Sequence, residues 1–138
     1  MASLVLTDAH IMINAVDMSA FVRSVAIEAT RETVEDTAMG DTARTFIASY
    51  RNWTMTFEMN QDFAAAATDA TLWPIFDGGT AVALVVRPVK LTAISATNPE
   101  YRGSGVMDEF PPIQGGVGTL ATTRARFRSA GTLTRNSV

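Results

Sequence analysis

The clearest structural signal in the sequence is the stretch Arg51-Asn-Trp-Thr-Met-Thr-Phe-Glu-Met-Asn60. Its side chains alternate between large apolar groups and polar ones. The apolar set is Trp53, Met55, Phe57 and Met59, and the polar set is Thr54, Thr56 and Glu58. A period of two in a segment rich in threonine and aromatic residues predicts a β-strand with one buried and one solvated face. We expect this strand to span residues 46–60.

A second alternating stretch precedes it, at residues 21–34. Val25, Ile27 and Ala29 fall on one face of this stretch, whereas Ser24, Glu28, Thr30 and Glu32 fall on the other. The two stretches together predict a long antiparallel hairpin with an apolar underside and a polar, mildly acidic upper side. We expect Trp53, Phe57, Val25 and Ile27 to form core with the strand at 81–86 and with a helix.

The loop that joins the two stretches, residues 35–44, is too long and too polar for a tight turn. It contains three acids and a single large apolar side chain, Met39. Such a segment has little apolar surface to bury, so we expect it to be mobile in an isolated subunit. Gly40 would permit a sharp bend within it.

The rest of the chain predicts further short strands and one helix. Strands are expected at residues 4–6, 11–16, 80–86, 91–96, 101–110 and 120–133, and a frayed tail at 134–138. The almost wholly apolar stretch 80–86 suggests a strand covered on both faces. The helix is expected around residues 69–76, with Thr68 or Asp69 as its N-cap, a kink or early end at Pro74, and an apolar face of Leu72, Trp73, Ile75 and Phe76. These elements predict one mainly β domain over residues 1–138, an antiparallel sandwich or barrel with one short flanking helix.

Composition excludes several classes of function. The 138 residues contain no cysteine and one histidine, His10, so thiol chemistry, disulfides and histidine-based metal centres are not expected. The net charge of −3 does not favour nucleic-acid binding by the surface as a whole. No apolar run approaches the roughly 20 residues that span a bilayer, and the first residues lack the pattern of a signal peptide. We therefore expect no membrane partner.

No constellation of residues indicates catalysis. Asp108 and Glu109 are adjacent in an expected strand and should point to opposite faces, so they would not form a carboxylate pair. Glu28 and Glu32 share a face but would lie about 13 Å apart. The run Gly115-Gly-Val-Gly118 lacks the Lys-Ser/Thr that follows in a phosphate-binding loop. We expect no catalytic residue, no metal and no cofactor.

Three arginines, Arg124, Arg126 and Arg128, recur at every second position of the last long strand. One interpretation is a strip that contacts a nucleic-acid backbone. The strip lacks interleaved exposed aromatic residues for base stacking, however. We favour ion pairing with acids of a neighbouring strand or chain, and expect the pairing to lie between subunits.

The chain resembles the major tail tube proteins of long-tailed bacteriophages, especially those of actinobacterial phages. The resemblance extends in order over nearly the whole chain. Its motifs are residues 17–25, beginning Asp17-Met-Ser-Ala-Phe; residues 34–44, around Met39-Gly-Asp-Thr-Ala-Arg44; Trp53-Thr-Met-Thr-Phe-Glu-Met-Asn-Gln-Asp-Phe63; Asp69-Ala-Thr-Leu-Trp-Pro74; Ser95-Ala-Thr-Asn-Pro-Glu-Tyr101; and Pro111-Pro112. A gene transfer agent or a secretion-system tube fits these motifs as well as a phage.

The resemblance implies a structural protein without enzymatic activity. Its subunits would form hexameric rings that stack into a hollow tube, with hairpins from the subunits closing an inner barrel. DNA and the tape measure protein would pass through this barrel. Tail terminator and tail tip proteins would cover the two ends. The protein would be located in the virion tail and be assembled in the cytoplasm of the bacterial host.

These implications assign roles to two sets of residues. The residues expected to face the lumen are Glu28, Thr30, Glu32, Thr54, Thr56 and Glu58. The residues expected to form the contact between rings are Glu35, Asp36, Met39, Gly40, Asp41 and Arg44. Two other functions stay open, a tail terminator or head–tail joining ring and a small β-sandwich that binds a ligand such as carbohydrate.

Overall fold

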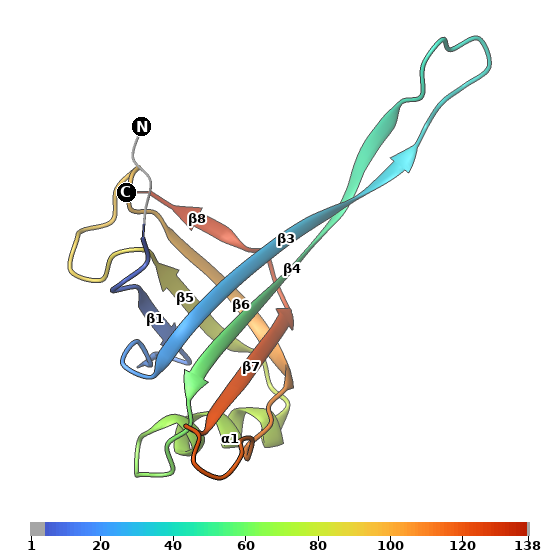
Figure 1. Ribbon diagram of the computed structural model, residues 1–138. Helices are drawn as coiled ribbons and strands as arrows, with labels where there is room; N and C mark the ends of the chain where they lie inside the picture. Colours follow the sequence, from blue (N-terminus) through green and yellow to red (C-terminus); the bar gives the residue numbers. More distant parts are fainter. Residues whose placement is uncertain (1–4, 138) are drawn as a thin grey trace.

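The computed structural model describes residues 5–137 and has eight strands and one helix in this range (Figure 1). The elements are β1 His10–Ile13, β2 Val16–Asp17, β3 Val22–Glu35, β4 Phe46–Asn60, α1 Thr68–Gly78, β5 Val82–Arg87, β6 Glu100–Glu109, β7 Thr122–Ser129 and β8 Thr134–Asn136. They form one antiparallel sheet in the order β2-β1-β5-β6-β7-β4-β3, and β8 pairs with β6. The mainly β class with one helix is confirmed, and the sheet does not close on itself.

The predicted hairpin is the longest feature of the molecule. β3 and β4 pair from Val22↔Met59 to Glu35↔Phe46, with register shifts between Val22 and Ser24 and between Arg31 and Thr33. The far part of the hairpin extends well beyond the rest of the sheet (Figure 1). We call residues 31–50 the arm and the remaining described residues the body.

The hydrophobic core lies in the body, against the apolar face of residues 51–60 of β4. Trp53, Met55, Phe57 and Met59 are all buried, as their alternation predicts. The Phe57 ring meets Phe127 of β7 edge to face, with ring centroids 5.9 Å apart. On β3, Val25 and Ile27 pack against this core but are only half-buried, because β3 is the last strand of the sheet.

Helix α1 packs at the end of the body remote from the arm (Figure 1). Leu72 and Ile75 are buried, and Thr68 is buried as well. The predicted N-cap is wrong, because the cap position is Ala67 and the Thr68 hydroxyl donates instead to the carbonyl of Asn60, at 2.8 Å. The helix passes through Pro74 and ends where Gly79 adopts φ 65°.

Four other details of the prediction are wrong. β5 is not covered on both faces, because its exposed residue Ala83 alternates with buried neighbours. Residues 91–96 form no strand and contain only one bridge, Ser95↔Asn98. Residues 134–136, expected to fray, pair with β6. Of the strand expected at 4–6, Leu4 lies outside the described residues, and residues 5 and 6 are not in a strand.

Candidate interaction surfaces

The arm has almost no contact with its own body. Every side chain from Arg31 to Tyr50 is exposed except half-buried Ser49. The exposed set includes large apolar groups, namely Val34, Met39, Phe46, Ile47 and Tyr50. An apolar surface of this kind on a projecting ribbon is typical of a binding surface for another protein.

The tip of the arm is held by local hydrogen bonds rather than by a core. The Thr45 hydroxyl donates a hydrogen bond to the carboxylate of Asp36 at 2.5 Å, and the backbone amide of Ala38 donates one to the carboxylate of Asp41 at 2.7 Å. Arg44 lies 3.8 Å from Glu35. Gly40 has φ 93°, so the bend that we expected there is present. The six residues predicted for the contact between rings thus lie together at the tip.

The polar face of the hairpin continues across β4 onto β7. The register places Glu28 opposite Thr54, and Thr54 opposite Arg128. Further along, Thr56 faces Arg126 and Glu58 faces Arg124. Four of the six predicted lumen residues, Glu28, Thr54, Thr56 and Glu58, therefore lie on one face together with the three arginines. Directly opposed strand residues share a face of the sheet.

The other two predicted lumen residues lie where the hairpin leaves the body. The Thr30 hydroxyl donates to the carbonyl of Asn52 at 3.4 Å. Glu32 falls within the register shift between Arg31 and Thr33. The extra residue at this shift belongs to β4, between Ala48 and Arg51, so the period of two in β3 continues from Glu28 through Glu32.

The three arginines form ion pairs with the adjacent strand β6. Arg124 contacts Glu109 at 2.7 Å, Arg126 contacts Asp108 at 3.0 Å, and Arg128 also contacts Asp108. Their partners thus come from a neighbouring strand of the same chain, which was one of the two sources that we considered. Pairing of these arginines between subunits stays a prediction.

A bulge in β6 makes this pairing possible. Met107 pairs with Phe127 and Glu109 with Arg126, so Asp108 is an extra residue in β6. The two acids therefore both reach the arginine face, and the expectation that they point to opposite faces is wrong. A period-two argument fails at a bulge because one strand gains a residue that its partner lacks.

Partial burial alone would raise the pKa of the Asp108 carboxyl, but hydrogen bonds from Arg126 and Arg128 and their positive charges hold this pKa below its usual value. The Asp108 carboxylate raises the pKa of Arg126 in turn. Both groups are therefore charged at neutral pH, and the Asp108 carboxylate stays charged into the acid range.

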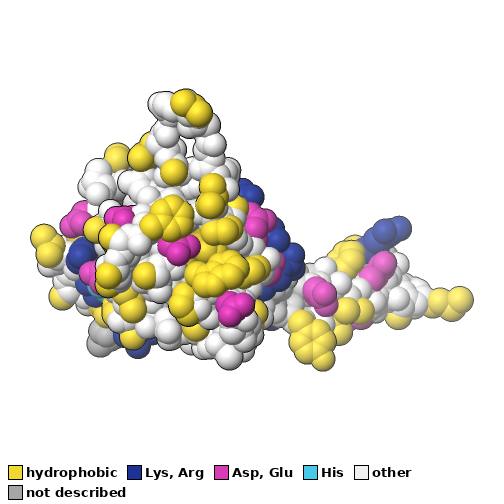
Figure 2. Space-filling model, turned by 90° about the horizontal axis from the view of Figure 1, so that it is seen from below, with side chains coloured by type: hydrophobic (Ala, Val, Ile, Leu, Met, Phe, Trp, Pro, Cys, Tyr) yellow, Lys and Arg dark blue, Asp and Glu magenta, His cyan; other side chains and the backbone are white. Residues whose placement is uncertain are grey.

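An aromatic cluster covers the outer side of α1. Trp73 and Phe76, which we expected on the apolar face of the helix that packs on the core, are 43% and 36% exposed. Their rings lie 5.8 Å apart, and each lies 6.5 Å from the ring of buried Phe110. Figure 2 looks onto this end of the molecule, where apolar side chains gather. Sequence periodicity marked the helix as apolar but did not separate its buried side from its exposed one.

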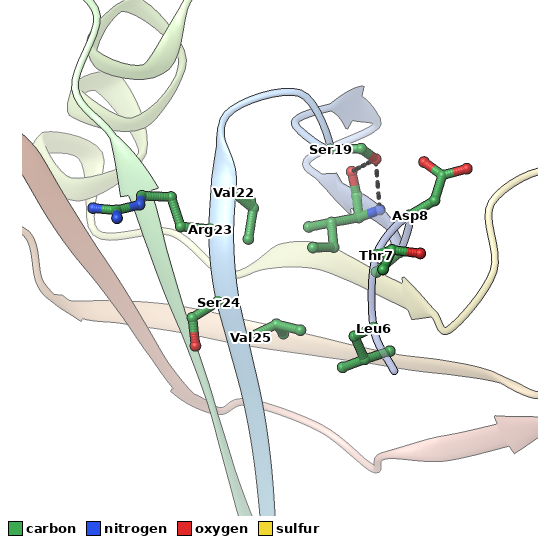
Figure 3. Close-up of a pocket in the computed structure, with 10 residues that line it drawn as sticks. Leu6, Thr7, Asp8, Ser19, Val22, Arg23, Ser24 and Val25 are labelled. Carbon is green, nitrogen blue, oxygen red and sulfur yellow. Dashed lines mark hydrogen bonds between the residues drawn. The ribbon is translucent and has the colours of Figure 1, made fainter. Parts of the chain in front are cut away.

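A hollow of about 280 Å³ opens between β3 and the segment that precedes β1 (Figure 3). Leu6 and Val25 contribute apolar lining, and Ser19 is one of its polar lining residues. The Ser19 hydroxyl accepts a hydrogen bond from the amide of Ile11 at 2.9 Å and donates to Asp17 at 2.6 Å. The Ser19 hydroxyl is thus engaged in hydrogen bonds within the fold.

The described residues also lack two further kinds of site. Between residues 5 and 137, no group of histidine and acidic side chains could hold a metal ion. No helix in the described part of the chain is long and apolar enough to cross a membrane.

By sequence, the chain matches no family model and no curated protein. By structure, it is similar to a chain in the virion of a native gene transfer agent particle, with a TM-score of 0.74, 18% identity, and coverage of 94% of this chain and 95% of the other. A second similar chain, in the tail of an empty gene transfer agent particle of C6 symmetry, has a TM-score of 0.67 and 18% identity, and the match covers 83% of this chain and 81% of the other. A third, in the six-fold symmetrised baseplate of the anti-feeding prophage, has a TM-score of 0.67 and 11% identity, and the match covers 100% of this chain and 99% of the other. At these identities, the likeness shows a shared fold.

Proposed function

We propose that this chain is the structural subunit of a phage-like tail tube, in which copies form hexameric rings that stack into a hollow conduit. The observation that carries the proposal is the arm, a two-stranded ribbon that projects from the body with its apolar side chains exposed. The shared fold with chains from a virion, a tail and a baseplate supports the same proposal.

The arm needs neighbours for a physical reason. A two-stranded ribbon alone is marginally stable in water, and an exposed edge strand pairs readily with other chains. β3 is the last strand of the sheet, so one row of its backbone groups has no strand partner among residues 5–137. Side-by-side packing of the arms of several copies would close a barrel, which removes free edges.

In this arrangement, the polar face lines the lumen and the apolar face packs on the body. Glu28, Thr54, Thr56 and Glu58 would face the channel within the body, with Thr30 beside them at the base of the arm, and Glu32 would continue this lining into the arm. Double-stranded DNA and a tape measure protein are the proposed occupants of the channel. A wall of threonine hydroxyls and paired charges suits passage better than an unpaired basic wall, which would hold DNA through counterion release.

The tip of the arm is the proposed contact between rings. Its acids, Thr hydroxyls and Arg44 suit polar docking on the next ring, with fully exposed Met39 as the apolar anchor. A single such contact would be weak, because ordering a loop costs conformational entropy. Six copies acting together would make stacking strong by multivalency.

The proposed subunit has a structural role without catalysis. It would be located in the virion tail after assembly in the cytoplasm of the bacterial host. Tail terminator and tail tip proteins are its proposed partners at the two ends of the tube. Long-tailed phages, including those of actinobacteria, and gene transfer agents are the proposed sources of such a particle.

Negative-stain electron microscopy of the purified protein tests this function. Long hollow tubes of constant diameter are expected. Isolated rings that do not stack would indicate a tail terminator or head–tail joining protein instead. Monodisperse monomers at high concentration would contradict assembly altogether and favour a ligand-binding module.

A further inference from the structure

The arginine row on β7, defined as Arg124, Arg126 and Arg128, is the densest basic feature of the polar face. Alternate residues of a strand lie on the same side, about 6.5 Å apart. Their side chains are 55%, 37% and 59% exposed. Three exposed guanidinium groups in a line could contact consecutive phosphates of a nucleic acid, because arginine binds phosphate through its planar fork of N–H groups.

The acids of β6 occupy these forks. Arg126 is bound at both ends, with Nε 3.1 Å from Asp108 Oδ1 and Nη2 3.0 Å from Oδ2. Arg124 donates from Nε at 3.0 Å and from Nη2 at 2.7 Å to a single oxygen of Glu109. Arg128 donates from Nε to Asp108. One aspartate therefore serves two arginines, and a glutamate serves the third.

The bulge in β6 explains why both acids can reach the arginine row. In a regular strand, Asp108 and Glu109 would point to opposite faces, and one of the two acids would be lost from the polar face. The extra residue in β6 brings both acids onto the face of the arginine row. β-Bulges often serve to redirect a side chain in this way.

The charge on the surrounding face is nearly balanced. The four carboxylates around the row belong to Glu28, Glu58, Asp108 and Glu109, and the register brings them to the same side as the three arginines. This leaves an excess of one negative charge. The wall is therefore ion-paired rather than simply acidic, which refines the expectation from sequence.

We propose that the arginine row is a masked polyanion-binding strip, in which Asp108 and Glu109 hold the guanidinium groups away from DNA phosphates. The biological meaning of the mask rests on the proposed function, since a conduit must let DNA slide. The mask itself is a property of the single chain. Its removal converts the polar face into a strip that binds double-stranded DNA without regard to sequence.

The test measures binding of a fluorescently labelled 25-base-pair duplex by anisotropy, with the full-length subunit fraction isolated by size-exclusion chromatography. The wild-type chain is expected to show no binding at 50 mM salt. D108N/E109Q is expected to bind, with an affinity that falls about 40-fold between 50 and 200 mM salt if three phosphates are contacted. D108N alone frees two arginines, so its affinity should fall about 12-fold between 50 and 200 mM salt. E109Q alone frees one arginine, so its affinity should fall about 3-fold over the same range.

A matched control variant removes the same number of negative charges as D108N/E109Q, but at positions away from the arginine row. Asp8 and Asp77 are exposed and lie outside the four strands of the polar face, so D8N/D77N should leave the protein unable to bind. Adding Arg124→Gln, Arg126→Gln and Arg128→Gln to D108N/E109Q should abolish the acquired binding. Far-UV circular dichroism establishes that each variant is folded, and the single variants carry the test if the double variant is not.

The proposal is overturned if D108N/E109Q and both single variants bind no better than D8N/D77N, or if the wild-type chain already binds as tightly as D108N/E109Q. These outcomes are independent of tube formation. Acquired binding in a protein that forms no tubes would uphold the mask and reject the tail tube. Tubes without acquired binding would reject the mask alone.

Discussion

The same two strands pass through two different environments. In the body, Trp53, Met55, Phe57 and Met59 of β4 are at most 3% exposed. In the arm, Phe46 and Ile47 of the same strand are 56% and 54% exposed. The backbone pairing of β3 with β4 continues through both regions. Strand pairing therefore does not distinguish the two regions, and the burial of side chains does.

This contrast separates two sources of order in one hairpin. The body is stabilised by apolar area removed from water within the chain. The arm lacks such area and is held by ladder and tip hydrogen bonds and the exposed ion pair of Arg44 with Glu35, which contribute little net stability in water. We infer that the body folds by itself and that the arm becomes fixed by contacts with other copies.

The largest expected effect of a single substitution on folding is that of Trp53→Ala in the body. Trp53 is 3% exposed, and its indole Nε1 donates to the carbonyl of Gly131 at 2.9 Å. Its loss should lower the free energy of unfolding by about 3–5 kcal/mol, measured by urea denaturation.

The control lies three residues away on β4, in the arm. Tyr50 is 81% exposed, so Tyr50→Ala should leave the denaturation midpoint nearly unchanged. Equal losses from the two substitutions would contradict the division into body and arm.

A smaller effect is expected at Gly103, beneath the same indole. A Cβ at Gly103 would lie 2.6 Å from Cζ2 of Trp53, so the ring would have to move. Gly103→Ala should lower the free energy of unfolding by about 1–3 kcal/mol. Gly78→Ala is the matched control, because a Cβ there meets its nearest atom, Oγ1 of Thr80, at 4.0 Å. Thermal denaturation of both variants checks the difference.

A still smaller, pH-dependent effect is expected from Asp17, which anchors β2. Partial burial would raise the pKa of its carboxyl, but hydrogen bonds from Ser19 and the ammonium group of Lys90, at 2.9 Å, hold this pKa well below its usual value. A lowered folded pKa stabilises the protein above about pH 4 and loses its contribution as the pH falls through the folded value. The stability difference between wild type and Asp17→Asn should thus shrink from pH 7 to pH 2. A difference that grows toward low pH would contradict the lowered pKa.

The smallest effect on folding is expected from the tip of the arm. Replacing residues 37–42 with Gly-Ser removes fully exposed Met39 and no core contact. The free energy of unfolding should stay within about 0.5 kcal/mol of the wild-type value, as at other exposed positions. The same variant should no longer form long assemblies in sedimentation. Tubes of normal length from it would remove the tip from the contact between rings.

The sequence predicted the parts of the fold that depend on a period of two. The bounds of β4 and the burial of Trp53 and Phe57 follow from alternation, because a half-buried sheet requires it. Alternation misled where the backbone gains a residue, as at Asp108. The apolar run at residues 80–86 misled for a different reason, because β5 keeps one face exposed, as at Ala83. Neither a bulge nor an open sheet face leaves a local signal in composition.

The candidate surfaces were predictable to a similar extent. The six tip residues and the polar side of the hairpin could be grouped from local sequence alone. The position of the arginine row on that same face could not, because it depends on the register Thr54↔Arg128 between strands far apart in sequence. The exposed aromatic cluster at Trp73 was missed for a related reason, since packing on the sheet decides which side of α1 is buried.

A helical reconstruction of the assembled protein by cryo-electron microscopy tests the central claim most directly. We expect a hollow tube in which arms of adjacent copies lie side by side around the channel. Glu28, Glu58 and the arginine row should face the channel, and each tip should contact the next ring. An assembly in which the arms point outward, with the polar face on the outer wall, would rule out a channel lined by this face.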